Sequence, residues 1–173
     1  MLIEKPLISS RITLRNCKRA DLPILTSMWF DEENGKYLSD PTSEYADEKF
    51  QKALDGIENN PKGYFMTALL NGTDKIIGSA FIFPDEKEGS FEIAYCVNKN
   101  YWRKGFGREI ISLLSGWIAD HGGKEITAEA AKENTASNRL LLDTGFKVCG
   151  ESSFKKYNMD ITYESFLYKL NLN

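Results

Sequence analysis

The feature that most constrains the fold is the segment of residues 98–108, Asn-Lys-Asn-Tyr-Trp-Arg-Lys-Gly-Phe-Gly-Arg, which contains two glycines one residue apart. An alternating apolar run, residues 91–97, precedes it, and a run with helical spacing begins near Glu109. The segment also carries three cations: Arg103, Lys104 and Arg108. Glycines let backbone amides approach a ligand closely, and a helix N-terminus attracts anions. The segment therefore predicts a phosphate-binding loop between a strand and a helix.

Two familiar nucleotide loops do not fit this segment. The dinucleotide-binding fingerprint requires a third glycine at the position occupied by Ile110, and the P-loop requires a Gly-Lys-Ser/Thr sequence that is absent. The predicted anion site is therefore of another kind.

Periodicity and turn residues predict the elements around this loop. Apolar alternation predicts seven strands: residues 11–15, 64–70, 76–83, 91–97, 126–131, 146–154 and 161–170. Helical spacing and capping residues predict four helices: residues 21–30, 47–57, 109–121 and 134–144. Short turns make the strands between residues 64 and 97 antiparallel, whereas the strand-helix-strand unit after them favours a parallel pair.

Two motifs resemble one family. Residues 101–107, Tyr-Trp-Arg-Lys-Gly-Phe-Gly, resemble the acetyl-CoA pyrophosphate loop of the GNAT N-acetyltransferase superfamily, usually Gln/Arg-x-x-Gly-x-Gly/Ala. Trp102 stands at the first position, and the Tyr-Trp pair is similar to the ribosomal-protein N-terminal acetyltransferase branch. Residues 134–146 resemble the family's Asn-x-x-Ala/Ser segment with its terminal Gly-Phe. The order of elements matches the GNAT plan over nearly the full chain.

This resemblance implies a mixed α+β fold in one domain of residues 1–173: a central twisted mixed sheet of about seven strands flanked by about four helices. It also implies that the strands at residues 91–97 and 126–131 splay apart to admit the pantetheine arm of acetyl-CoA. Acetyl-CoA is the expected co-substrate, and no metal is expected. The expected cofactor-binding residues are Cys96, Val97, Arg103, Lys104, Gly105, Phe106, Gly107, Arg108 and Asn134, with a backbone amide around Cys96 or Val97 holding the oxyanion.

Glu92 is the candidate catalytic base. Strand alternation places it with Ala94 and Cys96 on the face opposite Ile93, where partial desolvation would raise its pKa. From the residues alone, a carboxylate paired with a core cation or exposed on a strand fits equally well. The resemblance implies that Glu92 takes the proton of the attacking ammonium.

Ser137 is the candidate that would hydrogen-bond the leaving sulfur, although a hydroxyl in the first turn of a helix can equally bond to its own backbone. Many members of the family place a tyrosine seven residues after the motif asparagine, Asn134. That position holds Leu141, so the usual acid is missing.

The acceptor amine is expected to bind near the connection between the first two helices, which shapes the acceptor pocket in the family. Asp31, Glu32 and Tyr37 are the candidate substrate-binding residues, although each carboxylate there also fits a solvated loop. The branch resemblance favours a protein N-terminal amine. A polyamine, an aminoglycoside or an amino acid stays open, as does a non-catalytic CoA-binding regulatory domain.

Composition sets further bounds. The 173 residues suit one domain, and 42% hydrophobic with 27% charged residues suits a folded chain. A net charge of -3 gives no general attraction for nucleic acid, and no apolar run suggests a membrane partner or a signal peptide. We therefore expect a cytoplasmic monomer or homodimer. The three widely spaced cysteines, Cys17, Cys96 and Cys149, are expected to be buried, reduced thiols.

Overall fold

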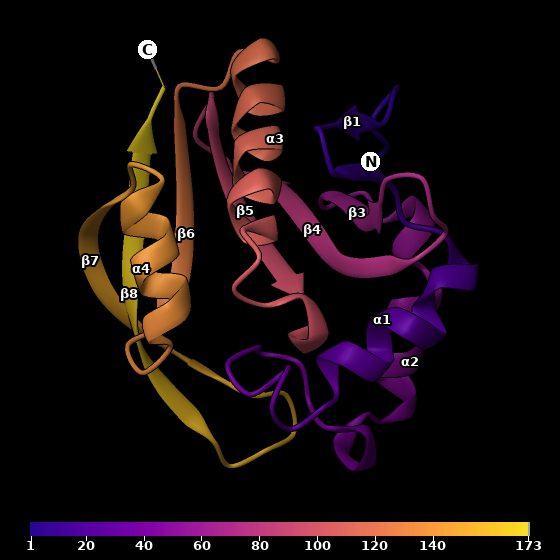
Figure 1. Cartoon of the computed structure of the whole chain (residues 1–173). Coiled ribbons are helices and arrows are strands. Elements are labelled where there is room, and N and C mark those ends of the chain that lie inside the picture. The colour runs from indigo at the N-terminus through magenta and orange to yellow at the C-terminus, as the bar shows by residue number, and fades with distance from the viewer. Residues whose placement is uncertain (173) are drawn as a thin grey trace.

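One mixed sheet organises the computed structural model, which describes residues 1–172 (Figure 1). Its strand order is β1-β2-β3-β4-β5-β6-β8-β7. The strands are β1 (Leu7–Ile8), β2 (Ile12–Asn16), β3 (Tyr64–Leu70), β4 (Ile76–Pro84), β5 (Ser90–Val97), β6 (Glu125–Ala131), β7 (Lys147–Lys155) and β8 (Thr162–Asn171). The α-helices within the described residues are α1 (Leu22–Trp29), α2 (Glu48–Asp55), α3 (Phe106–Asp120) and α4 (Thr135–Asp143).

The predicted α+β class and all eleven predicted elements are confirmed, with two differences. The sheet has eight strands in the described residues because the two-residue strand β1 pairs with β2 at its edge. A strand this short shows no alternation and could not be predicted. The helix predicted from Glu109 begins earlier, at Phe106, because Gly105 is its N-cap with φ 82°. Gly107 therefore lies inside the first helical turn.

The parting of β5 and β6 is the feature that matters most for function. The two strands pair in parallel only where Ser90–Glu92 faces Glu125–Thr127, and the rest of β6 pairs with β8 alone. On its other edge β5 is paired with β4 along its length. The predicted parallel pair and its splay are thus confirmed, and Figure 1 shows the strands diverging beyond their short contact.

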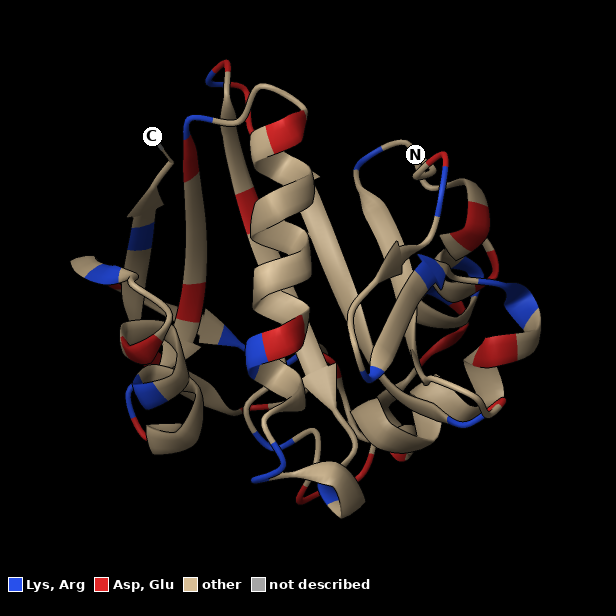
Figure 2. Ribbon diagram, turned by 45° about the horizontal axis from the view of Figure 1, so that its top comes forward, with Lys and Arg blue, Asp and Glu red and all other residues tan. Residues whose placement is uncertain are grey.

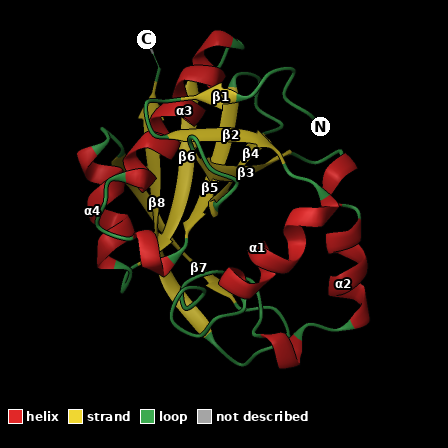
Figure 3. Ribbon diagram, turned by 45° about the vertical axis from the view of Figure 1, so that its right-hand side comes forward, coloured by secondary structure: helices red, strands yellow, loops and turns green. Residues whose placement is uncertain are grey.

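The two faces of the sheet are covered by different helices, and Figure 3 shows α1 and α2 grouped apart from α3 and α4. On the α3 side the buried core includes Ile110, Ile111, Leu114 and Ile118 of the helix and Ile12, Met66, Ile82 and Ile93 of the sheet. Each fully buried side chain of this size contributes roughly 1.5–3 kcal/mol. A second cluster on the α1 side consists of Cys17, Leu22, Leu25, Met28, Trp29, Ile57 and Cys96.

The helix α1 forms where the sequence repeats apolar residues on one face, with Pro23 tolerated in its first turn. Trp29 at its end donates its indole N–H to Ser79 Oγ at 3.0 Å, which satisfies both buried polar groups. Because Ile93 packs on the α3 side and Cys96 on the α1 side, the predicted alternation of β5 is confirmed.

Cys17 and Cys96 are buried as predicted, but the prediction is wrong for Cys149, which is exposed. Cys149 lies on β7, which pairs only with β8 at the edge of the sheet and is mostly exposed. Within residues 1–172, no helix is long and apolar enough to cross a membrane. In the same range, no three His, Cys, Asp or Glu side chains form a group that could hold a metal ion.

Candidate functional site

The glycine loop between β5 and α3 is shaped by backbone conformations that most residues avoid. Arg103 and Gly105 have positive φ angles of 59° and 82°. A Cβ on Gly107 would lie 2.7 Å from Leu140 Cδ2, so any larger residue there would force the Leu140 side chain to move. The resulting turn places the free amides of the first turn of α3 at its N-terminal end, where helices bind anions.

The predicted cofactor-binding residues of this loop meet in one place but differ in what they can do. Figure 2 shows cations around the N-terminal end of α3. Arg108 is already bound to the end of α4, donating to the Asp143 carbonyl at 3.0 Å, and Lys104 donates to the Asn100 carbonyl at 2.9 Å. Arg103 is exposed and makes no ion pair within residues 1–172.

Phe106 cannot contribute its side chain to a cofactor site, because the ring is buried in the core beneath the guanidinium of Arg11. Only its backbone amide remains available. Arg11, the residue just before β2, also donates to the Lys104 carbonyl at 2.9 Å and so holds the loop in place.

The hydrogen-bonding direction of β5 follows from two bonds at its ends. Asp85 N donates to Ser90 O at 3.0 Å, and Asn98 N donates to Ile77 O at 2.8 Å, both across the β4 edge. In an antiparallel pair every second residue directs both backbone groups to the partner strand. The residues of β5 that share the parity of Ser90 and Asn98 therefore direct their amides to β4.

Cys96 has that parity, so its N–H belongs to the β4 ladder. Val97 and Tyr95 have the other parity and direct their N–H groups into the space between β5 and β6. Trp102 Nε1 donates to the Val97 carbonyl on that side at 2.7 Å. Of the two predicted oxyanion donors, the geometry thus favours the amide of Val97.

Glu92 lies opposite Thr127 at the last paired position before the splay, on the α1 side of the sheet. Its carboxyl group reaches solvent, yet surrounding protein atoms desolvate it and raise its pKa; the charges of Glu129 and Asp85 act in the same direction. A carboxylate with a raised pKa is a better proton acceptor near neutral pH.

The surroundings of Cys96 disfavour it as a nucleophile. Its thiol accepts a hydrogen bond from Asn34 Nδ2 at 3.1 Å. Burial raises the pKa of the Cys96 thiol to about 12, so the thiolate is not formed near neutral pH.

Asn134 and Ser137 lie together in the first turn of α4. The Oδ1 atom of Asn134 caps the helix by accepting from Ser137 N at 3.1 Å. The Ser137 hydroxyl lies 3.0 Å from the Tyr95 hydroxyl. Leu141, at the position of the family's usual tyrosine, is buried in the core and brings no polar group to the site.

Asn138 is a supporting residue that no local sequence pattern singled out. Its Nδ2 donates to the carbonyl of Ala131 at 3.0 Å, and its Oδ1 accepts from Tyr168 at 2.8 Å. These bonds fasten α4 to the end of β6 and to the middle of β8, and so fix the far wall of the splay.

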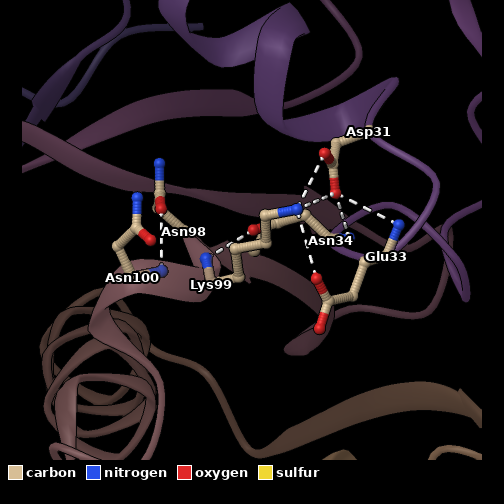
Figure 4. A network of polar contacts seen from close by, with 7 residues as sticks. Asp31, Glu33, Asn34, Asn98, Lys99 and Asn100 are labelled. Atoms are coloured by element: carbon tan, nitrogen blue, oxygen red, sulfur yellow. Dashed lines mark hydrogen bonds and ion pairs between the residues drawn. The ribbon is translucent and has the colours of Figure 1, made fainter.

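Asp31, a predicted substrate-binding residue, is occupied by other groups of the protein (Figure 4). Lys99 Nζ lies 3.0 Å from both of its carboxylate oxygens. The N–H of Asn34 and the ammonium of Lys99 lower the pKa of Asp31. The side chain of Asn34 also accepts from Lys99 N at 2.5 Å, so this network, which we call the Lys99 clasp, joins residues 31–34 to the start of the glycine loop.

A cavity of about 260 Å³ lies between the α1–α2 connection and the β7–β8 hairpin. It is lined by Trp29, Asp31, Glu32, Gly35, Lys36, Thr42, Lys156, Met159, Ile161 and Tyr163. Glu32 is exposed there and makes no ion pair within the described chain. Tyr37 packs edge-on against Tyr163 with ring centres 5.4 Å apart.

The β7–β8 hairpin is held to the α1–α2 connection by a buried lysine that the sequence did not reveal. Lys156 Nζ donates to the carbonyls of Gly35 and Leu38 at 2.9 and 2.8 Å. The lysine thus fixes one wall of the cavity.

The family model for the acetyltransferase (GNAT) domain matches residues 11–147. The chain belongs to the GNAT acetyltransferase family. It is 27% identical over 145 residues to the uncharacterized N-acetyltransferase p20 of Bacillus licheniformis, covering 82% of each chain. As a member of this family, the protein is an acetyl-CoA-dependent acetyltransferase.

Solved GNAT structures share the whole fold. A GNAT-family acetyltransferase from Bacillus anthracis superimposes with a TM-score of 0.79 at 18% identity, covering 96% of this chain and 98% of that one. The Salmonella typhimurium enzyme that modifies the N-terminal serine of ribosomal protein L7/L12 gives 0.77 at 14% identity, with 98% and 100% covered. Another structure of an L7/L12 acetyltransferase, with a TM-score of 0.77 at 13% identity, holds coenzyme A. The predicted likeness to the ribosomal-protein branch is confirmed at the level of fold.

Proposed function

We propose that this GNAT enzyme moves the acetyl group of acetyl-CoA directly onto the α-amine of a protein N-terminus. The observation that carries the direct-transfer part is the splay itself, where the amides of Tyr95 and Val97 face an opening that ends at Glu92. An extended amide-containing arm can pair with these groups as a missing strand would.

The glycine loop supplies the other end of the proposed acetyl-CoA site. The pyrophosphate of acetyl-CoA accepts from the amides at residues 105–107, and Arg103 adds charge from its exposed position. Gly105 and Gly107 keep this surface open. Asn134, beyond its capping bond, retains an Nδ2 donor for the pantetheine arm.

Glu92 acts as the base. It accepts the proton of the ammonium, directly or through water, because only a neutral amine can attack the thioester. The unperturbed pKa of an α-amine is about 8, so a large fraction is protonated at pH 7. Attack places negative charge on the carbonyl oxygen, and the amide of Val97 is directed to receive it. No acyl-enzyme forms, in keeping with a protonated thiol at Cys96.

The acceptor binds on the α1 side, beside Glu92 and near Glu32. Within residues 1–172 the Glu32 carboxylate makes no ion pair, so it is better suited to a cationic amine than Asp31, which Lys99 neutralises. The fold likeness to an enzyme that modifies an N-terminal serine supports a peptide acceptor. A cytoplasmic location and a monomeric or homodimeric state remain predictions of the sequence.

Release of CoA thiol in the presence of amine panels tests the proposal. We expect transfer to short peptides with free N-termini and none to the same peptides with blocked N-termini. Peptide lysines, polyamines, aminoglycosides and free amino acids form the comparison set. Preference for any of these over N-terminal amines would contradict the proposed acceptor, while absence of transfer to all amines would contradict the proposed reaction.

A further inference from the structure

A tyrosine from β5 and a serine from α4 meet across the splay. The Tyr95 hydroxyl lies 3.0 Å from Ser137 Oγ. The Tyr95 ring packs against the α3-side core, and its Cε2 atom would lie 3.8 Å from a Cβ on Gly107. Packing and backbone therefore fix where the phenol can point.

Each of the two hydroxyl groups has one hydrogen, and this decides which hydrogen bonds the pair can donate to a third group. A serine hydroxyl has one hydrogen to donate and can accept at its oxygen. Burial raises the pKa of the Tyr95 phenol to about 12, so it stays protonated and can always be the donor to Ser137. The Ser137 hydrogen is then free for a third group.

That third group can be identified from the two faces of β5. The Glu92 carboxylate lies on the α1 side, while the Tyr95 ring lies on the α3 side with Ser137. Under the proposed function, the amine approaches a thioester in the splay from the face of Glu92, so the Ser137 hydroxyl is on the face left for the departing sulfur. Leu141 is buried and offers that sulfur no donor.

We propose that Tyr95 is a positioning residue that orients the Ser137 hydroxyl as the hydrogen-bond donor to the departing sulfur, an inference that rests on the proposed function. As the C–S bond breaks, its electron pair moves to sulfur and the amine proton moves to Glu92. Ser137 stabilises the sulfur anion with a charge-assisted bond while it accepts from Tyr95. The thiolate then takes its proton from solvent, and Tyr95 keeps its own throughout.

The test is a double-mutant cycle on the single-turnover rate, with acetyl-CoA and the best peptide acceptor of the parent enzyme. We expect Tyr95→Phe to lower the rate about tenfold and Ser137→Ala to lower it by about tenfold to a hundredfold. Because Tyr95 acts through Ser137, the double variant should be no slower than Ser137→Ala. The calorimetric Kd for acetyl-CoA should stay at the parental value in all three.

Tyr64→Phe is the matched control, since Tyr64 of β3 packs on Trp117 of α3 and lies outside the proposed catalytic residues. It should leave the rate unchanged. A Tyr95→Phe enzyme as fast as the parent, or single losses that multiply in the double variant, would overturn the inference while leaving the proposed function intact. A Tyr95→Phe loss explained by weaker acetyl-CoA binding would also overturn it. A parent that acetylates no amine instead contradicts the proposed function itself.

Discussion

Glu92 lies directly opposite Thr127, and this is the last position at which β5 and β6 are paired. The carboxylate therefore stands at the vertex of the splay, where protein atoms crowd it on the closed side and solvent reaches it on the open side. Its raised pKa follows from this position, since desolvation is the largest cause. One break in the ladder thus sets both the position and the surroundings of this carboxylate.

Glu92→Gln tests the base. The variant keeps the size and hydrogen-bonding capacity of the side chain, so acetyl-CoA affinity should hold while turnover at pH 7 falls by about a hundredfold or more. The parent rate should rise with pH as the carboxyl group loses its proton, at a pKa above the usual carboxyl value. The loss should shrink above the acceptor pKa of about 8, where the amine is already neutral. A pH-rate profile of both enzymes measures this, and near-parental turnover at pH 7 removes Glu92 from the mechanism.

The stability of the same variant separates a catalytic from a structural role. Because the pKa of Glu92 is raised in the folded state, ionising it costs stability, and that cost is fully present above the folded pKa. Gln removes the ionisation, so the melting temperature at pH 7 should equal or exceed that of the parent. A lower melting temperature with an equal activity loss at every pH would indicate a structural role.

Replacing Gly105 and Gly107 together by valine should abolish phosphate binding at the glycine loop. Valine is strained at the positive φ of Gly105, and a side chain at Gly107 meets Leu140. Acetyl-CoA affinity should fall at least about a hundredfold, since each hydrogen bond to a charged group is worth roughly 1.5–3 kcal/mol. Calorimetry on the folded variant checks this, and unchanged affinity would refute the site.

Gly116→Ala is the matched glycine control, because no atom lies within 4 Å of the added Cβ in α3. It should leave affinity unchanged and stabilise the helix by roughly 0.5–1 kcal/mol.

Breaking the Lys99 clasp should weaken the acceptor site and spare the chemistry. Lys99→Met removes the ammonium from Asp31 and Glu33 while keeping the apolar stem. We expect KM for the peptide to rise about fivefold with kcat nearly unchanged, as suits an ion pair worth up to about 1 kcal/mol. Arg19→Met, which breaks the exposed Arg19–Asp55 pair, serves as control. Equal KM values for both variants would show that the clasp does not shape the acceptor site.

Lys156→Met should destabilise the fold. The substitution removes the donor to the Leu38 carbonyl and one of the two donors to the Gly35 carbonyl, which keeps its bond from Leu38 N. Since an unsatisfied buried polar group costs about 1–3 kcal/mol, the free energy of unfolding in urea should drop by roughly 2 kcal/mol or more. The neighbouring Lys155→Met, which removes only an exposed pair with Asp160, should change it by less than about 0.5 kcal/mol. Equal effects of the two would contradict the role assigned to Lys156.

Alkylation should distinguish the three cysteines. Burial raises the pKa of Cys17 to about 11 and that of Cys96 to about 12, whereas Cys149 is exposed. Iodoacetamide at pH 8 should therefore label Cys149 first in the folded protein, as mass spectrometry of peptides would reveal. Cys96→Ala should keep its rate within about tenfold of the parent, because only one weak bond from Asn34 is lost. An acetylated Cys96, or a dead alanine variant that still folds, would argue against direct transfer.

Local signals predicted most of the fold, because apolar spacing and turn residues directly reflect what forms each helix, strand and turn. Pro23 stands in the first turn of α1, and Gly-containing turns separate strands whose apolar residues alternate. Asp21 precedes α1 as predicted but makes no side-chain capping bond, because its carboxylate accepts from Arg15 and Thr67. The face that Glu92 occupies was predicted because alternation alone decides which side of a sheet a strand residue faces. Its assignment as the base came from the family resemblance. Cys149 was misjudged because burial at a sheet edge depends on what covers the edge, and periodicity carries no information about that.

The missing parts of the candidate site all depend on contacts between distant segments. In the sequence, Tyr95 looks like one more apolar residue of β5. The structure shows its hydroxyl beside Ser137, which is 42 residues away. Lys156 reads as a turn lysine, yet it is bound 121 residues from Gly35. Such pairs leave no trace in local spacing, since neither partner violates the pattern of its own element.

The short ladder between β5 and β6 also has a mechanical meaning. Only three residue pairs join the half of the sheet that runs from β1 to β5 to the half formed by β6, β8 and β7. Beyond them the described residues connect the halves through α3 and its flanking loops, through the Tyr95–Ser137 contact, and through the bonds of Lys156 that hold the β7–β8 hairpin to the α1–α2 connection. The pantetheine arm of acetyl-CoA, paired along β5, would hold the two halves together. The amide protons of Tyr95 and Val97 should therefore exchange rapidly with solvent in the free enzyme and slowly once acetyl-CoA is bound.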